Sequence, residues 1–225
     1  MKIAEIFHSI QGEGILAGVP SAFVRLSGCN LRCVWCDTPY TSWTPEGSEM
    51  QIGEVVEAVR GARYVVVTGG EPMIFADVVP LTAGLRKLGV HITIETAGTV
   101  FQPAACDLMS ISPKLANSTP VEREGGRWAA QHDRLRYQPE VLRALMSACE
   151  YQLKFVVSSP EDLPEIETML SEIGADRGRV LLMAEGTDPG AIQERARWLV
   201  EVCRRQGFRY SPRLHIDIWG NRRGV

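Results

Sequence analysis

The chain has 225 residues, of which 45% are hydrophobic and 23% are charged, and these proportions are typical of a folded globular protein rather than a disordered one. Its length fits one domain, since α/β barrels often reach this size as a single unit. The net charge of −3 gives no broad basic surface, which argues against a direct DNA- or RNA-binding protein.

The N-terminus and the cysteine content favour a cytoplasmic protein. Charged residues interrupt the N-terminal segment, and no apolar signal-peptide core follows it. No apolar run approaches the ~18 residues that a membrane-spanning helix needs. The six cysteines are therefore expected to be reduced thiols or metal ligands rather than a disulfide framework.

Strand and helix patterns alternate along the chain. Short β-branched runs predict the strands, and apolar residues at helical spacing predict the helices. In chain order the predicted elements are strand 22–26, helix 52–60, strand 64–68, helix 78–88, strands 90–95 and 108–112, helix 139–150, strand 152–157, helix 163–173, strand 180–183, helix 189–206 and strand 214–218. This alternation predicts an α/β fold of parallel strands joined by right-handed crossovers.

Residues 117–138 break the alternation. They are polar, with Gly125 and Gly126 in the middle, and we interpret them as an insertion or a mobile flap. No linker marks a second domain, so residues 1–225 are predicted to form a single domain.

Three closely spaced cysteines follow the first predicted strand. Cys29, Cys33 and Cys36 form a C-x3-C-x2-C loop, and thiolates are the usual ligands of iron–sulfur clusters. Three cysteines leave one iron of a four-iron cubane free to bind a small molecule. Structural zinc is the alternative, although it normally takes four ligands. The remaining cysteines lie in apolar or helical segments and are predicted to be buried as small hydrophobic residues: Cys106, Cys149 and Cys203.

The cysteine loop, with Trp35 before its last cysteine, resembles the signature of radical S-adenosylmethionine (SAM) enzymes. The resemblance implies a [4Fe–4S] cluster on Cys29, Cys33 and Cys36, whose open iron chelates the amino and carboxylate groups of SAM. One electron then cleaves SAM to methionine and a 5′-deoxyadenosyl radical, which removes hydrogen from the substrate. The protein positions these cofactors and excludes water.

A second motif, Thr68-Gly-Gly-Glu-Pro72, follows strand 64–68. Alone it would be an ordinary turn, but downstream of the cysteines it resembles the superfamily's contact with the methionine amino group. Functional groups at successive strand ends are typical of barrel enzymes. The resemblance implies a SAM site formed by Val34, Trp35, Gly69, Gly70, Glu71, Ser112, Pro113, Lys114, Met183, Ala184, Glu185 and Gly186.

Three further features point toward the substrate, although each has an ordinary structural interpretation. The Gln11-Gly-Glu-Gly14 loop could be a plain turn, since no P-loop lysine follows it. Arg25 could face solvent from its strand, or it could clamp a substrate carboxylate with two hydrogen bonds. Asp37 could cap a turn, and Thr38 could offer its hydroxyl to a hard cation.

Together with Glu95-Thr-Ala-Gly98, Ser112-Pro-Lys114 and the C-terminal segment 219–225, these features resemble the 7-carboxy-7-deazaguanine synthases nearly from end to end. The resemblance implies a partial parallel (β6/α3) barrel with a C-terminal extension. It also implies a carbon–nitrogen lyase that converts 6-carboxy-5,6,7,8-tetrahydropterin to 7-carboxy-7-deazaguanine and ammonia by ring contraction. That reaction belongs to 7-deazapurine and queuosine biosynthesis.

The same resemblance implies Mg²⁺ on Thr38, an external reductant of the flavodoxin or ferredoxin type, and a homodimer. The implied substrate site consists of Ile10, Gln11, Gly12, Glu13, Arg25, Asp37, Thr68, Glu95 and Val225. His215 could also reach the substrate, but a structural role is favoured for it.

Two other function classes stay open at this point. A radical SAM activating enzyme, which makes a glycyl radical on a partner protein, shares the cysteine spacing. A non-catalytic iron–sulfur or zinc-binding regulator would share the cysteines without turnover. Cleavage of SAM and turnover of the pterin separate these classes from the ring-contracting lyase.

Overall fold

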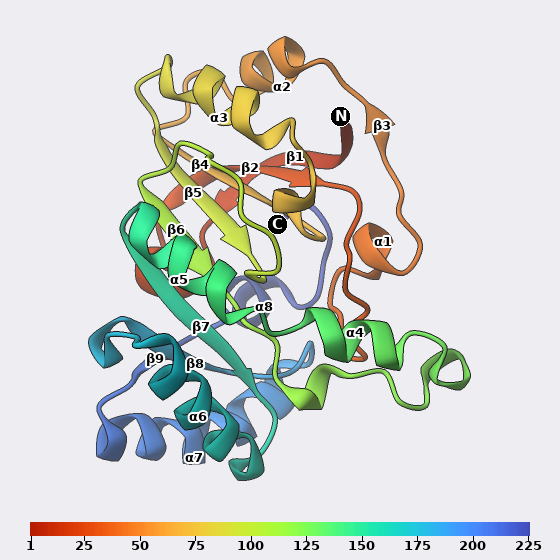
Figure 1. The fold of residues 1–225 in the computed structure, drawn as a ribbon. Helices are drawn as coiled ribbons and strands as arrows, with labels where there is room; N and C mark the ends of the chain where they lie inside the picture. The colour runs from red at the N-terminus through yellow and green to blue at the C-terminus, as the bar shows by residue number, and fades with distance from the viewer.

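The computed structural model describes all 225 residues and shows one open, curved sheet (Figure 1). Nine strands follow the order β3-β1-β2-β4-β5-β6-β7-β8-β9. The two outer strands, β3 and β9, do not pair with each other, so the sheet does not close. The fold is therefore a partial barrel, and this prediction from the sequence is confirmed.

Seven strands run parallel, namely β2 and β4 to β9, while β1 and β3 are antiparallel additions. The strands are β1 (Lys2–Ile10), β2 (Pro20–Leu26), β3 (Ser48–Glu49), β4 (Tyr64–Gly69), β5 (His91–Thr96), β6 (Leu108–Ile111), β7 (Tyr151–Val157), β8 (Val180–Ala184) and β9 (Arg209–Ser211). The helices are α1 (Pro39–Ser42), α2 (Ile52–Ala58), α3 (Val78–Arg86), α4 (Ala129–Leu135), α5 (Pro139–Ala148), α6 (Leu163–Ile173), α7 (Pro189–Gln206) and α8 (Leu214–Trp219).

Helices α3, α5, α6 and α7 connect successive parallel strands and follow the sheet around its outer side (Figure 1). Their apolar stripes and the strands bury a single main core, in which residues such as Leu81, Phe155 and Leu199 are fully enclosed. Burying a large apolar side chain contributes about 1.5–3 kcal/mol. Local signals set the helix ends: the Asp188 carboxylate accepts from Ala191 N at 2.9 Å to begin α7, and Gly207 ends it.

The predicted strand at 214–218 is wrong, because these residues form helix α8. The Leu-His-Ile-Asp-Ile sequence alternates like a strand, yet Ile216 is 1% exposed and Ile218 is 56% exposed. The place beside β8 is taken by β9, which the sequence analysis missed. It also missed β1, because charged residues such as Glu5 interrupt the apolar pattern of that segment. In the structure, Glu5 pairs with Arg25 of the neighbouring strand β2.

Residues 117–138 contain two 3₁₀ turns and helix α4, and they lie against the cysteine loop. Their contacts, described below, include backbone hydrogen bonds such as Val34 N to Ser118 O at 2.8 Å. The mobility of this segment stays a prediction. None of the helices is both long and apolar enough to cross a membrane.

The C-terminal ends of parallel strands meet at one edge of a sheet, and here that edge carries the loops with the predicted site residues. The β4 end approaches the β2 end closely: an added Cβ at Gly69 would lie 2.2 Å from the Leu26 carbonyl oxygen. Gly69 also has a φ of +149°, a conformation that glycine alone adopts readily. The Gly-Gly motif thus brings the β4 loop against the start of the cysteine loop.

We expect Gly69→Ala to lower the free energy of unfolding by at least about 3 kcal/mol, because backbone strain and steric overlap add. Gly89→Ala is the matched control, since its φ is also positive, at +70°, but no atom lies within 4 Å of the added Cβ; a loss of only about 1 kcal/mol is expected there. Urea denaturation of the cluster-free protein measures both. Equal losses in the two variants would contradict the close approach.

Candidate active site

A cavity of about 500 Å³ lies at the C-terminal edge of the sheet. It is lined by residues from the β1–β2 loop, the cysteine loop, the ends of β4 to β8 and the segment after β9. The cavity includes seventeen of the residues predicted from the sequence: Gln11, Glu13, Arg25, Cys29, Cys33, Trp35, Cys36, Asp37, Thr38, Thr68, Gly69, Gly70, Glu95, Ser112, Lys114, Met183 and Val225. The predicted residues that do not line it are Ile10, Gly12, Val34, Glu71, Pro113, Ala184, Glu185 and Gly186.

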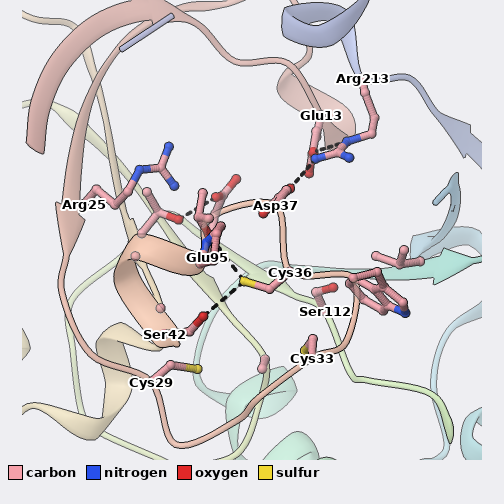
Figure 2. A pocket seen from close by; sticks show the side chains of 18 of the residues that line it. Glu13, Arg25, Cys29, Cys33, Cys36, Asp37, Ser42, Glu95, Ser112 and Arg213 are labelled. Carbon is pink, nitrogen blue, oxygen red and sulfur yellow. Dashed lines mark hydrogen bonds and ion pairs between the residues drawn. The ribbon is translucent and has the colours of Figure 1, made fainter. Parts of the chain in front are cut away.

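The three loop cysteines surround one part of this cavity (Figure 2). All three are free thiols, and Cys36 Sγ lies 3.2 Å from Ser42 Oγ. Burial raises the pKa of Cys29 to about 12 and raises that of Cys33 as well. The Cys29 and Cys33 thiols therefore stay protonated until iron binds, and cluster assembly must release those protons.

Three thiols from one loop line the cavity, and thiolates are the usual ligands of iron–sulfur clusters. A structural zinc ion normally takes four ligands. No three His, Cys, Asp or Glu side chains of the chain are arranged to hold a single metal ion.

Residues of the 117–138 segment hold the cysteine loop in place. The buried His132 ring accepts from Arg32 N through Nδ1 at 3.0 Å, and its Nε2 lies 2.8 Å from Ser118 Oγ. Since Ser118 Oγ donates to Leu115 O at 2.6 Å, it accepts from Nε2–H of His132. Because Nδ1 accepts from Arg32 N, the imidazole is neutral. Burial is the main cause that lowers the pKa of His132 to about 4. The sequence analysis found no partner for this histidine.

The loop after β4 is organised by Glu71, which is fully buried. Its carboxylate accepts from Met73 N, Thr96 Oγ1 and Ala97 N at 2.7–3.0 Å. Burial raises its pKa, partly offset by these hydrogen bonds. Glu71 therefore holds the loop that carries Gly69 and Gly70, which line the cavity, although Glu71 itself does not line it. A contact between Glu71 and SAM stays a prediction.

Two polar side chains from neighbouring elements, Gln11 and Thr68, donate to Glu95. Its two carboxylate oxygens accept from Gln11 Nε2 at 3.1 Å and from Thr68 Oγ1 at 2.8 Å. Each ionised carboxylate oxygen can accept further hydrogen bonds. Glu95 is therefore fixed by its neighbours and still able to accept N–H groups from a ligand.

Arg25 lines the cavity and is ion-paired to Glu5, with 2.7 Å between Arg25 Nε and Glu5 Oε1. Tyr40 also donates to Glu5 Oε1, at 2.7 Å. Although burial opposes it, the surrounding anionic groups raise the pKa of Arg25. Its two terminal nitrogens make no hydrogen bond within the chain, so they can bind a carboxylate. The strand arginine does not simply face solvent.

A chain of four charged groups lines the other side of the cavity, and Figure 2 shows three of them, Glu13, Arg213 and Asp37. Glu13 pairs with Lys154 and, at 3.0 Å, with Arg213 Nε, and Arg213 also pairs with Asp37. Burial opposes ionisation of both carboxyl groups. The positive charges of Lys154 and Arg213 nevertheless lower the pKa of Glu13, and the charge of Arg213 lowers the pKa of Asp37. The two carboxylates are therefore ionised and neutralised within the chain.

Sequence analysis missed Lys154 and Arg213 as site residues. Lys154 stands in a buried strand sequence, and Arg213 lies in a segment predicted to lead into a strand. His215, which was left with a structural role favoured, lines the cavity. Its ring packs on Gly12, where an added Cβ would lie 2.0 Å from Nδ1. Because Gly12 has no side chain, the His215 ring can occupy this position at the cavity wall.

Comparisons with known proteins agree with this geometry. A family model described as the Radical SAM superfamily matches residues 23–157. A 7-carboxy-7-deazaguanine synthase of Halobacterium salinarum is 44% identical over 98% of this chain and 91% of that protein. One of Rhodopirellula baltica is also 44% identical, over 100% of this chain and 89% of that protein. The crystal structure of QueE from Escherichia coli has a TM-score of 0.69 and 28% identity, covering 93% of this chain and 92% of that one.

The His132 site predicts a pH-dependent stability. The unfolded histidine binds a proton below pH 6.5, whereas the folded one does so only near pH 4. Its stabilising contribution is therefore present above pH 6.5 and falls by on the order of 2–3 kcal/mol as the pH drops to 4. Urea unfolding of the cluster-free protein across this range measures it. His132→Gln should flatten the profile and the exposed His8→Gln should not; an unchanged slope in His132→Gln would contradict the assignment.

Proposed function

We propose a function from one premise: the chain belongs to the 7-carboxy-7-deazaguanine synthase family, within the radical SAM superfamily. It is a carbon–nitrogen lyase that converts 6-carboxy-5,6,7,8-tetrahydropterin to 7-carboxy-7-deazaguanine and ammonia, a step toward queuosine and related 7-deazapurines. The observation that carries this conclusion is that one cavity contains both the three cysteines and a polar set suited to a carboxylated pterin.

The family implies a [4Fe–4S] cluster and SAM, and the residues present fit them. Cys29, Cys33 and Cys36 supply the three thiolates. The bare backbone of Gly69 and Gly70, with further groups from later strand ends, would hold SAM beside them. When bound, the cluster and SAM supply reductive SAM cleavage and hydrogen-atom abstraction. The proposed SAM contacts in the cavity are Trp35, Gly69, Gly70, Ser112, Lys114 and Met183.

Lys114 also shapes this region, since its Nζ donates to Ser112 O at 2.6 Å and to Ser112 Oγ at 2.9 Å. These bonds fix the direction of the Ser112 side chain at the end of β6. A positive charge and an oriented hydroxyl beside the cluster loop suit the carboxylate and ribose groups of SAM.

The pterin would be oriented by groups at two ends of the cavity. The free terminal nitrogens of Arg25 suit the pterin carboxylate, because a guanidinium and a carboxylate can form two parallel hydrogen bonds. Glu95, held by Gln11 and Thr68, suits the N–H donors of the 2-aminopyrimidinone ring. The substrate is thereby fixed in orientation as well as in place, which hydrogen-atom abstraction at one carbon requires.

We infer a Mg²⁺ ion at Thr38. Thr38 lines the cavity. Its hydroxyl makes one polar contact within the chain, a long one of 3.9 Å to Cys36 Sγ. The 2.9 Å hydrogen bond from Thr41 Oγ1 goes to the Thr38 carbonyl oxygen and leaves the hydroxyl free. Mg²⁺ commonly uses few protein ligands together with substrate oxygens and water. The substrate carboxylate would share the ion, with the ionised Asp37 nearby in sequence.

Further parts of the proposal rest on the family. The electron would come from an external protein of the flavodoxin or ferredoxin type, and the chain would act in the cytoplasm as a single-domain subunit of a homodimer. The alternative activity, making a glycyl radical on a partner protein, is disfavoured, since relatives that match the chain along its full length are named 7-carboxy-7-deazaguanine synthases.

Anaerobic turnover tests the proposed function. Cluster-reconstituted protein with SAM, a chemical reductant, Mg²⁺ and the carboxylated pterin should form 7-carboxy-7-deazaguanine and ammonia, detected by ultraviolet absorbance and mass spectrometry. Because the cluster is required, Cys33→Ala should form no product. SAM cleavage without any deazaguanine from the intact protein would sink the proposal.

Arg25→Ala should raise the KM for the pterin by about 30-fold or more, because a buried charged hydrogen-bond pair costs 2–5 kcal/mol to break. Cluster content, measured as iron and sulfide, should stay unchanged. Arg60→Ala is the control, since that arginine makes only an exposed pair with Glu57. Unchanged pterin kinetics in Arg25→Ala would exclude the carboxylate-binding role.

A further inference from the structure

Arg213 is the side chain that joins the loops of the site to one another. It is 5% exposed and stands directly before α8. Its Nε donates to Glu13 Oε1 at 3.0 Å, Nη1 donates to Gly186 O, and Nη2 donates to Asp37 Oδ2. The three acceptors lie on three separate segments: the β1–β2 loop, the cysteine loop and the loop after β8.

These three segments are the ones that carry different ligands in the proposed function, on which this inference rests. Glu13 lies in the loop proposed for the pterin, and Asp37 is next to Thr38 and Cys36. Gly186 lies just after β8, the strand whose Met183 is proposed to contact SAM. We propose that Arg213 is a positioning residue that fixes the pterin-binding and SAM-binding loops relative to each other.

The dependence on Arg213 differs among its partners. Glu13 keeps a second ion pair, with Lys154, and its loop has other anchors, such as Gly14 N to Ser211 Oγ at 2.8 Å. By contrast, the Asp37 carboxylate and the Gly186 carbonyl make no other hydrogen bond within the chain. Loss of Arg213 should therefore release the Asp37 and Gly186 segments more than the β1–β2 loop.

The chemistry of the side chain explains why arginine is needed here. A guanidinium presents five donors in a rigid planar fork, so one residue can bind three acceptors in different directions. A lysine keeps the charge but offers a compact group on a flexible stem. Arg213→Lys therefore keeps the positive charge but removes the ability to bind three acceptors at once, so it tests the bridging geometry alone.

The experiment compares Arg213→Lys with Arg177→Lys, a matched control. Arg177 also binds two carboxylate oxygens, of Glu167, and a carbonyl, of Gln206, at a site that does not line the cavity. Hydrogen exchange of the cluster-free proteins should become faster around Asp37 and Gly186 in Arg213→Lys and stay unchanged there in the control. In reconstituted protein, the Kd for SAM and the KM for the pterin should each rise by about tenfold or more.

A third readout distinguishes positioning from simple loss of folded protein. Misplaced loops should increase severalfold the amount of 5′-deoxyadenosine released per deazaguanine formed, whereas partial unfolding lowers both in proportion and leaves the ratio unchanged. An unchanged ratio, with unchanged exchange and SAM affinity, would overturn the proposal.

Should Arg213→Lys fail to fold, Arg213→Gln takes its place. Hydrogen exchange and SAM binding test Arg213 even if the wild type makes no deazaguanine, so the two failures are distinguishable.

A separate observation concerns two cysteines at the opposite edge of the sheet. Cys106 precedes β6 and Cys149 precedes β7, and their sulfur atoms lie 3.0 Å apart. Both residues are partly exposed, so a small oxidant can reach them. The prediction that Cys106 and Cys149 are buried small hydrophobic residues is therefore wrong, whereas Cys203 is buried as predicted.

We infer that Cys106 and Cys149 are an oxidation site that forms an internal disulfide. With hydrogen peroxide as the oxidant, two thiols and one peroxide give one disulfide and two water molecules. The bond would join the N-terminal ends of two neighbouring parallel strands and close a loop that contains α4 and α5. Closing a loop of this kind stabilises a fold mainly by restricting the unfolded chain.

Peptide mass mapping after mild peroxide treatment should reveal a Cys106–Cys149 cross-linked peptide that dithiothreitol reverses. Cys203, which has no sulfur partner, should stay reduced under the same conditions. The oxidised protein should melt at a higher temperature than its reduced form, and Cys149→Ser should abolish that difference. Oxidation of the two thiols to separate sulfinic acids, with no cross-link, would overturn the inference.

Discussion

The site depends on hydrogen bonds that hold the β1–β2 loop across the open barrel. This loop leaves β1 near one end of the sheet order, yet Gly14 N donates to Ser211 of β9 and Ile15 N donates to Gln152 of β7. Leu214 N donates to Gly12 O at 2.9 Å as well. Backbone groups must find partners when they are buried, and here those partners lie across the cavity. These hydrogen bonds hold the β1–β2 loop across the C-terminal edge of a sheet that does not close.

The cysteine loop needs a different kind of support, because it has no regular secondary structure over most of its length. Two of its backbone N–H groups, of Arg32 and Val34, donate to His132 and Ser118 of the segment that the sequence showed only as a polar interruption. The Trp35 side chain of the loop donates to Asn117 of the same segment. Hydrogen bonds from a packed segment keep the three thiols facing one cavity. Binding groups held in advance lower the ordering cost when a ligand arrives.

Charge is distributed in the cavity so that its two sides differ. Arg25 keeps two terminal nitrogen atoms free despite its pair with Glu5, whereas Arg213 donates hydrogen bonds from all three of its nitrogen atoms to protein acceptors. In the proposed function, the same residue type would bind substrate at Arg25, whereas at Arg213 it binds protein loops. Burial and partner count, rather than residue identity, decide between the two roles.

The sequence by itself determined the parallel α/β architecture, the cysteine loop and most of the residues that line the cavity. Those features depend on local spacing and on motifs placed at strand ends, which leave a readable pattern. Only the tertiary structure decided that residues 214–218 are a helix, that Glu71 and His132 brace loops of the site, and that Lys154 and Arg213 line the cavity. Each of these depends on partners far away in the chain, such as the pairing of Arg213 with Glu13, and no local pattern records a partner of that kind.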